Sequence, residues 1–254
     1  MPEGDTIHRT ATTLRRVLTT EVVTAVTTPR RQGPSPGIGE TVDAKGKHLL
    51  IGFSGGLTLH THMRMTGSWH TYPHGARWRT PRSEMVARIE TPEAEAVCFS
   101  APEVEVLDPS ALARHPQLRA LGPDLCTEGV DLDEVLDRLR RLDPSTSIGV
   151  ALLDQRVAAG IGNVYRSETL WACRTDPFMP LDVLEADRRR DLFATASRLL
   201  RANLDVPHER RTVPQGLAVY DRSGRPCGRC GATIRSRRQG DQGRTTWWCP
   251  ACQT

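Results

Sequence analysis

The first apolar residues of the chain recur at intervals of three and four positions, the spacing of one face of an α-helix. Over residues 3–19 this face carries Ile7, Ala11, Leu14, Val17 and Leu18. The spacing predicts an amphipathic N-terminal helix with that face turned toward a core.

After residue 20 the pattern changes to short runs with strand character, separated by turn residues. These runs predict strands at residues 21–27, 47–53, 57–63, 84–90, 95–100 and 104–107, with surface connections at 33–39 and 72–83. The Ser-Gly-Gly sequence at 54–56 predicts a hairpin turn between the second and third strands. Several short strands joined by turns are typical of a β-sandwich.

Helical spacing returns beyond the Leu-Gly-Pro-Asp sequence at 121–124, over residues 131–142, 147–154, 161–173 and 186–204. The Asp-Pro-Ser sequence at 143–145 is a helix-entry signal. We therefore place a domain boundary near residues 122–130. The pattern predicts a sandwich domain over 1–125, a helical domain over 131–218 and a separate terminal segment over 219–254.

The terminal segment contains two Cys-x2-Cys pairs, Cys227 with Cys230 and Cys249 with Cys252. Two pairs at this separation predict a structural zinc site with four thiolate ligands and no open coordination position. The other cysteines, Cys98, Cys126 and Cys173, are scattered without the spacing of a disulfide framework, and we expect buried reduced thiols.

The charge distribution adds a candidate partner. The net charge of the 254 residues is only +4, but residues 207–254 hold nine arginines against three acidic residues. Phosphate backbones are the usual partner of such a surface. Two alternatives do not involve a phosphate partner: the metal serves only to stabilise a small terminal fold, or the arginines reflect a preference for arginine throughout this chain. Only Lys45 and Lys47 are lysines among 34 basic residues.

The composition is that of a globular protein, with 38% hydrophobic and 25% charged residues. No apolar run is long enough to cross a bilayer, and the N-terminus lacks a basic-then-apolar signal pattern. We expect a cytoplasmic protein that does not bind membranes.

A second candidate phosphate contact lies between the predicted helices. Gly160 and Gly162 flank a turn into a helix that begins near Asn163. Backbone N–H groups at a helix start, with a side-chain amide beside them, form an anion site. The alternative is an ordinary helix cap after ordinary turn glycines.

Six segments together resemble the formamidopyrimidine-DNA glycosylase/endonuclease VIII family, in the family's order. They are PEG at 2–4, GKHLL at 46–50, HMRMTGSW at 62–69, LLDQRVAAGIGN at 152–163, VYDRSGRPC at 219–227 and RTTWWCPAC at 244–252. The resemblance implies an α+β fold: an N-terminal helix with a β-sandwich, then a helix–two-turn–helix domain with a zinc-finger hairpin. It also implies a monomeric base-excision-repair enzyme that acts on damaged double-stranded DNA, with zinc as its only ligand.

The resemblance assigns the chemistry to four residues. Removal of Met1 would leave Pro2 as a secondary amine, and α-amino groups have a pKa of about 7.7–8.0, so part of the amine is neutral near pH 7. Such an amine can attack C1′ and form a Schiff base. Glu3 is the expected acid/base partner, Lys47 the lesion-phosphate contact, and Arg244 the phosphate contact that serves the second elimination. Taken alone, Glu3 could be a first-turn carboxylate and Lys47 a strand-edge cation.

Base removal from a duplex requires the nucleotide to be flipped out. By resemblance Arg64, Met65 and Thr66 form the intercalating loop, with Met65 as the apolar plug and Arg64 facing the estranged base. The alternative is Met65 in the sandwich core. His60, His62, His70 and His74 are spaced as alternating strand residues, and we expect no second metal there.

Two features favour the endonuclease VIII branch and oxidised pyrimidine substrates. The D-P-R-R-F-G wedge motif of the guanine-type branch is missing from residues 101–115, and the stretch between Leu204 and Val219 is short. Asp5 and Thr6 stand where many relatives carry Pro and Glu. The alternatives are the same β,δ-elimination chemistry on oxidised purines, and a non-catalytic protein that binds damaged DNA.

Overall fold

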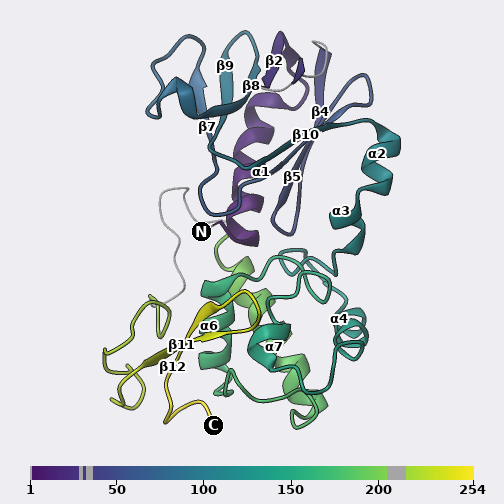
Figure 1. Cartoon of the computed structure of the whole chain (residues 1–254). Helices are drawn as coiled ribbons and strands as arrows, with labels where there is room; N and C mark the ends of the chain where they lie inside the picture. The colour runs from purple at the N-terminus through teal and green to yellow at the C-terminus, as the bar shows by residue number, and fades with distance from the viewer. Residues whose placement is uncertain (1, 29–30, 33–36, 205–215) are drawn as a thin grey trace. The chain divides into compact units, whose positions relative to one another are not determined.

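The computed structural model describes residues 2–28, 31–32, 37–204 and 216–254. It divides into two compact units, Met1–Arg119 and Ala120–Thr254 (Figure 1).

The described part of the first unit is a sandwich of two five-stranded antiparallel sheets, against which the N-terminal helix α1 (Gly4–Leu18) packs. The strand order in the first sheet is β1 (Val22–Val23), β4 (Gly37–Lys45), β5 (His48–Phe53), β6 (Thr58–His62) and β10 (Glu103–Leu107). In the second it is β3 (Arg31–Gln32), β2 (Ala25–Thr28), β8 (Met85–Glu90), β9 (Ala94–Phe99) and β7 (Ser68–Pro73). The predicted helix and β-sandwich are confirmed.

The core of this unit is built from alternate strand residues and the apolar face of α1. Ile7, Ala11, Leu14 and Leu18 of the helix are almost fully buried, as the helical spacing predicts. They belong to one cluster with Leu49 and Ile51 of β5, Leu59 of β6, and Ala87, Ile89 and Cys98 of the second sheet. The hairpin predicted at residues 54–56 joins β5 to β6.

Three features of this unit differ from the prediction. The strand expected at 21–27 is two strands, β1 and β2, which pair in different sheets. Strands β3, β4 and β7 were not predicted: β4 is mostly exposed and begins inside the connection expected at 33–39, and β7 ends inside the connection expected at 72–83. Residues after β10 form two short helices, α2 (Pro109–Arg114) and α3 (Pro116–Ala120), where Asp108 caps α2 through the Ala111 N–H at 2.7 Å.

In its described residues, 120–204 and 216–254, the second unit contains four helices and a two-stranded hairpin. The helices are α4 (Leu132–Leu139), α5 (Ile148–Ala151), α6 (Asn163–Ala172) and α7 (Ala186–Arg201), and the hairpin strands are β11 (Arg235–Gln239) and β12 (Arg244–Trp248). All four helices were predicted, but α5 is shorter than residues 147–154. Apolar side chains of all four helices share one buried cluster that includes Leu136, Ile148, Tyr165 and Phe193. None of the helices in the described ranges is both long and apolar enough to span a bilayer.

Candidate functional site

Two predicted catalytic residues stand at the start of α1. Pro2 is half-buried, and Glu3, the residue that precedes the helix, is fully buried with 0% exposure. The Glu3 carbonyl accepts the Thr6 and Ile7 N–H groups at 3.0 and 3.2 Å, but its side chain does not cap the helix. The Glu3 carboxylate is thus buried beside the N-terminal residue at the positive end of α1, where a helix-stabilising role and an acid/base role are compatible.

Lys47 occupies a tight turn between β4 and β5. Gly46 and Lys47 form the turn, and Lys45 pairs with His48 across it. Gly46 has a φ of 58°, a conformation that glycine adopts without strain. Helix α1 packs against both β4 and β5. The hairpin thus holds Lys47 at a fixed, half-buried end of the first sheet.

The predicted intercalating residues form the turn between β6 and β7. Met65 is 66% exposed, whereas Met63 and Trp69 on either side are buried. The Gly67 N–H donates to the Met63 carbonyl at 2.8 Å, and a side chain at Gly67 would collide with that carbonyl. The turn therefore presents Met65 to solvent, and the alternative of Met65 in the core is wrong. Thr66 closes the turn through its hydroxyl, which donates to the Ser100 carbonyl at 2.9 Å.

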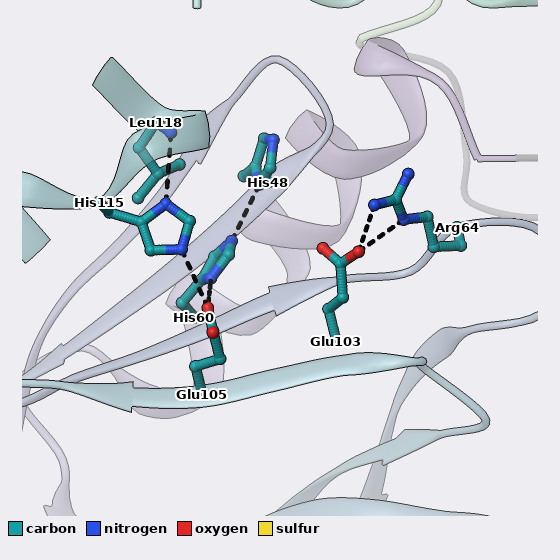
Figure 2. Close-up of polar contacts among 7 residues, drawn as sticks. All are labelled: His48, His60, Arg64, Glu103, Glu105, His115 and Leu118. Atoms are coloured by element: carbon teal, nitrogen blue, oxygen red, sulfur yellow. Dashed lines mark hydrogen bonds and ion pairs between the residues drawn. The ribbon is translucent and has the colours of Figure 1, made fainter. Parts of the chain in front are cut away.

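Arg64 is held in place by groups on both sides. Its Nε donates to Glu103 Oε1 at 2.8 Å, and Nη2 binds the same oxygen (Figure 2). Its backbone N–H donates to His62 Nδ1 at 3.1 Å, and its φ is 48°. Because both the backbone and the guanidinium are fixed, the direction of Arg64 is set within the unit itself.

His62 lies among cations of the same region. Burial, and to a smaller extent the positive charges of Arg64 and Lys47, lower the pKa of His62 to about 4, although the Glu103 carboxylate acts in the opposite direction. His62 pairs with His48, the residue after Lys47, so the Lys47 turn and the Arg64 turn lie at the same end of the β5–β6 pair. Sequence spacing alone did not connect them.

In the second unit, Asn163 begins α6 and contacts the hairpin. Its Nδ2 donates to the Thr245 carbonyl at 2.9 Å. Arg166, one turn further along α6 and fully buried, donates to the same carbonyl at 2.8 Å and also contacts Asn163 Oδ1. Two donors thus fix the residue that follows Arg244. The sequence analysis did not identify Arg166 as a functional residue. A charged residue on a helix whose other residues are mostly buried could have indicated it.

Arg244 begins β12 and is half-buried, with Nε donating to Gln242 Oε1 at 2.9 Å. Gln239, at the end of β11, ties the same hairpin to the helices. Its Nε2 donates to the Ser147 hydroxyl and the Pro177 carbonyl, both at 2.8 Å. The orientation of Arg244 therefore depends on hydrogen bonds to the helical part of this unit.

The four predicted zinc ligands come together. The sulfur atoms of Cys227, Cys230, Cys249 and Cys252 all lie within 4.8 Å of one another. Two of the separations are 4.0 Å, Cys227 to Cys252, and 3.5 Å, Cys230 to Cys249. A tetrahedral ion with Zn–S bonds of about 2.3 Å requires S–S edges of about 3.8 Å. The cluster fits a tetrahedral ion, with each cysteine supplying one thiolate.

The segment that leads into this cluster is held by Glu168 of α6. Its carboxylate is 3% exposed and accepts three backbone N–H groups, from Ala218, Val219 and Tyr220, at 2.8, 3.0 and 2.9 Å. The cysteine-bearing segment is therefore attached to the helices at both its beginning and its hairpin.

A β-sandwich with an N-terminal helix, a helical unit with an Asn-led helix, and a four-cysteine hairpin together form the architecture that the sequence motifs imply. The formamidopyrimidine-DNA glycosylase N-terminal domain matches residues 1–103, and the helix–two-turn–helix domain of the same enzymes matches residues 121–213. The chain belongs to the formamidopyrimidine-DNA glycosylase/endonuclease VIII family.

Several relatives are similar along their whole length. A probable endonuclease 8 2 of Streptomyces coelicolor is 41% identical over all of this chain and 94% of its own. The DNA-(apurinic or apyrimidinic site) lyase Nei2 of Mycolicibacterium smegmatis is 36% identical over all of this chain and 99% of its own, and endonuclease 8 of Escherichia coli is 32% identical over the whole of both.

Solved structures agree on the fold. MutM in complex with DNA containing carbocyclic 8-oxo-G superimposes with a TM-score of 0.85 at 20% identity over all of both chains. Lactococcus lactis Fpg in complex with DNA containing an oxidised pyrimidine also gives 0.85, at 19% identity over all of both chains.

Proposed function

We propose that this protein removes oxidised pyrimidines from duplex DNA and then cleaves the strand by β,δ-elimination, with Pro2 as the nucleophile. The observation that carries the proposal is the β6–β7 turn. A base that leaves the stack needs an apolar group to replace it and a polar group to face its former partner. Met65 at 66% exposure and Arg64 held by Glu103 supply these two groups side by side.

The chemistry follows from the residues near the N-terminus. Once Met1 is removed, the Pro2 nitrogen attacks C1′, the N-glycosidic bond breaks, and the base leaves with a proton. The resulting iminium makes the C2′ proton acidic, and Glu3 is suited to move protons at the sugar. Loss of that proton breaks the 3′ C–O bond, and a second elimination breaks the 5′ C–O bond. Hydrolysis then frees Pro2.

Lys47 and Arg244 act on the phosphates in this proposal. Lys47 stands in the turn between β4 and β5, and Arg244 begins strand β12 of the second hairpin. When bound by the four cysteines, zinc would supply structure alone, because four thiolates leave no position for a water ligand. Asn163, whose amide holds the Thr245 carbonyl beside Arg244, marks the start of α6 as the proposed contact for another phosphate.

Two observations support the pyrimidine branch. The relatives at 32% and 41% identity are named as endonuclease 8. Residues 103–120, where the guanine-type branch carries its second wedge, form β10, α2 and α3, and no large apolar side chain in this stretch is exposed.

Strand cleavage on matched duplexes tests the proposal. The substrates are thymine glycol opposite adenine, 8-oxoguanine opposite cytosine, and an abasic site. We expect cleavage of the thymine glycol and abasic duplexes. Met65→Ala should slow base removal at least tenfold and affect the abasic site less, because that substrate has no base to displace. Val183→Ala, which shortens an apolar side chain of similar exposure (65%), is the matched control. Preference for 8-oxoguanine would refute the branch.

A further inference from the structure

Four histidines and a glutamate gather on the face of the first sheet that is turned away from the α1 core. His48 of β5 and His60 and His62 of β6 stand on this face, while Leu49, Ile51 and Leu59 point into the core. His115, between α2 and α3, and Glu105 of β10 complete the cluster (Figure 2).

Hydrogen bonds connect most of these groups in one line. Glu105 Oε2 binds two rings, His60 through Nδ1 at 2.9 Å and His115 through Nε2 at 3.0 Å. His60 Nε2 lies 2.9 Å from His48 Nδ1, and the two rings stack. Neutral imidazoles are costly to bury without partners, so a connected arrangement of this kind requires each ring to hold one defined tautomer.

The Leu118 amide fixes those tautomers. Its N–H lies 3.3 Å from His115 Nδ1 and can only donate, so Nδ1 accepts and Nε2 carries the proton that is donated to Glu105. A carboxylate only accepts, so His60 Nδ1 also carries a proton. His60 Nε2 then accepts from His48 Nδ1–H. Burial lowers the pKa of both His48 and His60, which agrees with neutral rings.

This order of donors and acceptors argues against a second metal site. His60 Nδ1, His115 Nε2 and Glu105 are close enough together to hold an ion. However, both ring nitrogens that face Glu105 carry protons, and a metal needs their lone pairs. Zinc-binding histidines direct their other N–H to an acceptor, whereas His115 meets the Leu118 N–H, a donor.

Both ends of this hydrogen-bonded chain reach residues next to the turn that contains Lys47. Lys45 Nζ donates to the Leu118 carbonyl at 3.1 Å, so Leu118 is bound through both its N–H and its carbonyl. Lys45 and His48 are paired across the turn. Both residues that flank the Gly46–Lys47 turn are therefore anchored, one to Leu118 and the other through His60 to Glu105.

We propose that Glu105 is a positioning residue for Lys47, acting through His60 and His48 on one side of the turn and through His115, Leu118 and Lys45 on the other. This role rests on the proposed function, in which Lys47 contacts the lesion phosphate. Displacing a catalytic group by about 1 Å can cost on the order of 100-fold in rate. Glu105 binds both histidines through a single oxygen, an arrangement that the oxygen of a neutral side-chain amide can also accept.

Single-turnover cleavage of an abasic-site duplex, with saturating enzyme, tests this role. Glu105→Ala should lower the cleavage rate at least tenfold while DNA affinity stays within twofold. Glu105→Gln keeps one oxygen that can accept both bonds, and should restore the rate to within about threefold of wild type. Asp43→Asn removes a carboxylate from β4 outside the network and is the matched control. His115→Ala removes the connection from Glu105 to Leu118 and Lys45, and should also lower the cleavage rate. It therefore tests the proposal even if the Glu105→Ala protein does not fold.

The histidine tautomers can be measured directly in the wild type, and a general loss of stability in a variant does not explain them. Long-range ¹H–¹⁵N spectra should show protons on Nδ1 of His48 and His60 and on Nε2 of His115, and no change when Zn²⁺ is added beyond one equivalent. Different tautomers, tight binding of a second zinc, full activity of Glu105→Ala, or a Glu105→Gln variant as slow as Glu105→Ala would each overturn the proposal. A wild type that cleaves no abasic site would refute the proposed function, and this role with it, while leaving the predicted tautomers intact.

Discussion

Replacement of Glu168 should loosen the segment that leads into the four-cysteine hairpin. The carboxylate accepts three backbone N–H groups and is almost fully buried. Its Oε1 accepts from Val219 and Tyr220, and its Oε2 accepts from Ala218. Glutamine and alanine therefore remove different parts of the interaction.

The expected costs follow from the number of bonds lost. A hydrogen bond to a charged group contributes about 1.5–3 kcal/mol, and a buried donor left without a partner costs about 1–3 kcal/mol. Glu168→Gln can keep the two bonds to Oε1 and loses one, so we expect a cost of about 2 kcal/mol. Glu168→Ala loses all three and leaves the buried Val219 N–H without its acceptor, so we expect about 5–9 kcal/mol.

Hydrogen exchange measured by mass spectrometry resolves this effect from events in the sandwich unit. Amides of residues 218–220 should exchange faster in both variants than in the wild type, and fastest in Glu168→Ala. Urea unfolding should show the lowest free energy of unfolding for Glu168→Ala, an intermediate value for Glu168→Gln and the highest value for the wild type. Glu185→Gln alters an exposed carboxylate that makes no cap hydrogen bond at the start of α7, and is the control. Wild-type exchange at 218–220 in Glu168→Ala would refute the reasoning.

Two further changes have definite expected results. Cys249→Ser should reduce bound zinc from about one ion per chain to none, because metal binding supplies the folding energy of such a site. The affinity for duplex DNA should fall together with the zinc content, whereas the control Cys173→Ser should retain the metal. Plasma mass spectrometry measures the bound zinc and fluorescence anisotropy measures the affinity. An unchanged affinity in Cys249→Ser would show that Arg244 does not contribute to DNA binding. Burial is the largest cause of the low pKa of both His48, about 2, and His62, about 4; the neighbouring histidines and Arg64 add to it at His48, and Arg64 and Lys47 add to it at His62. The unfolded chain therefore takes up protons below the ordinary histidine pKa of about 6.5 while the folded chain does not, so each ring should remove about 1.5 kcal/mol of stability between pH 6.5 and pH 5. His48→Gln should flatten the pH dependence of urea unfolding by that amount, and an unchanged slope would contradict these pKa values.

The elements that the sequence predicted well are those whose periodicity reflects burial on one side. Helix α1 and strands β5, β6, β8 and β9 carry their apolar residues at regular spacing because one face of each meets the core. Strand β4 has the exposed pattern of an outer layer and begins in a glycine-rich stretch, so its ladder with β5 was not visible in the sequence. The split of residues 21–27 between two sheets is likewise a tertiary choice, fixed by pairing with β4 and β8.

The candidate site was predictable where motifs are contiguous. Pro2, Glu3, Lys47 and the four cysteines each lie in a short recognisable segment. The partners that position these residues were not predicted, because they come from distant parts of the chain. Glu105 reaches His60 across 45 residues, and Arg166 reaches Thr245 across 79. No local pattern marks such pairs, and only the folded strands and helices bring them together.

The central claim is that the amine of Pro2 forms the covalent bond to DNA. Borohydride reduction of the processed protein on an abasic-site duplex, followed by peptide mapping of the adduct, tests it most directly. We predict a reduced sugar adduct on the N-terminal peptide at Pro2, and none with Pro2→Gly under conditions where that variant still binds the duplex. An adduct on Lys47 or another lysine, or no adduct despite tight binding by protein that begins at Pro2, would contradict the account.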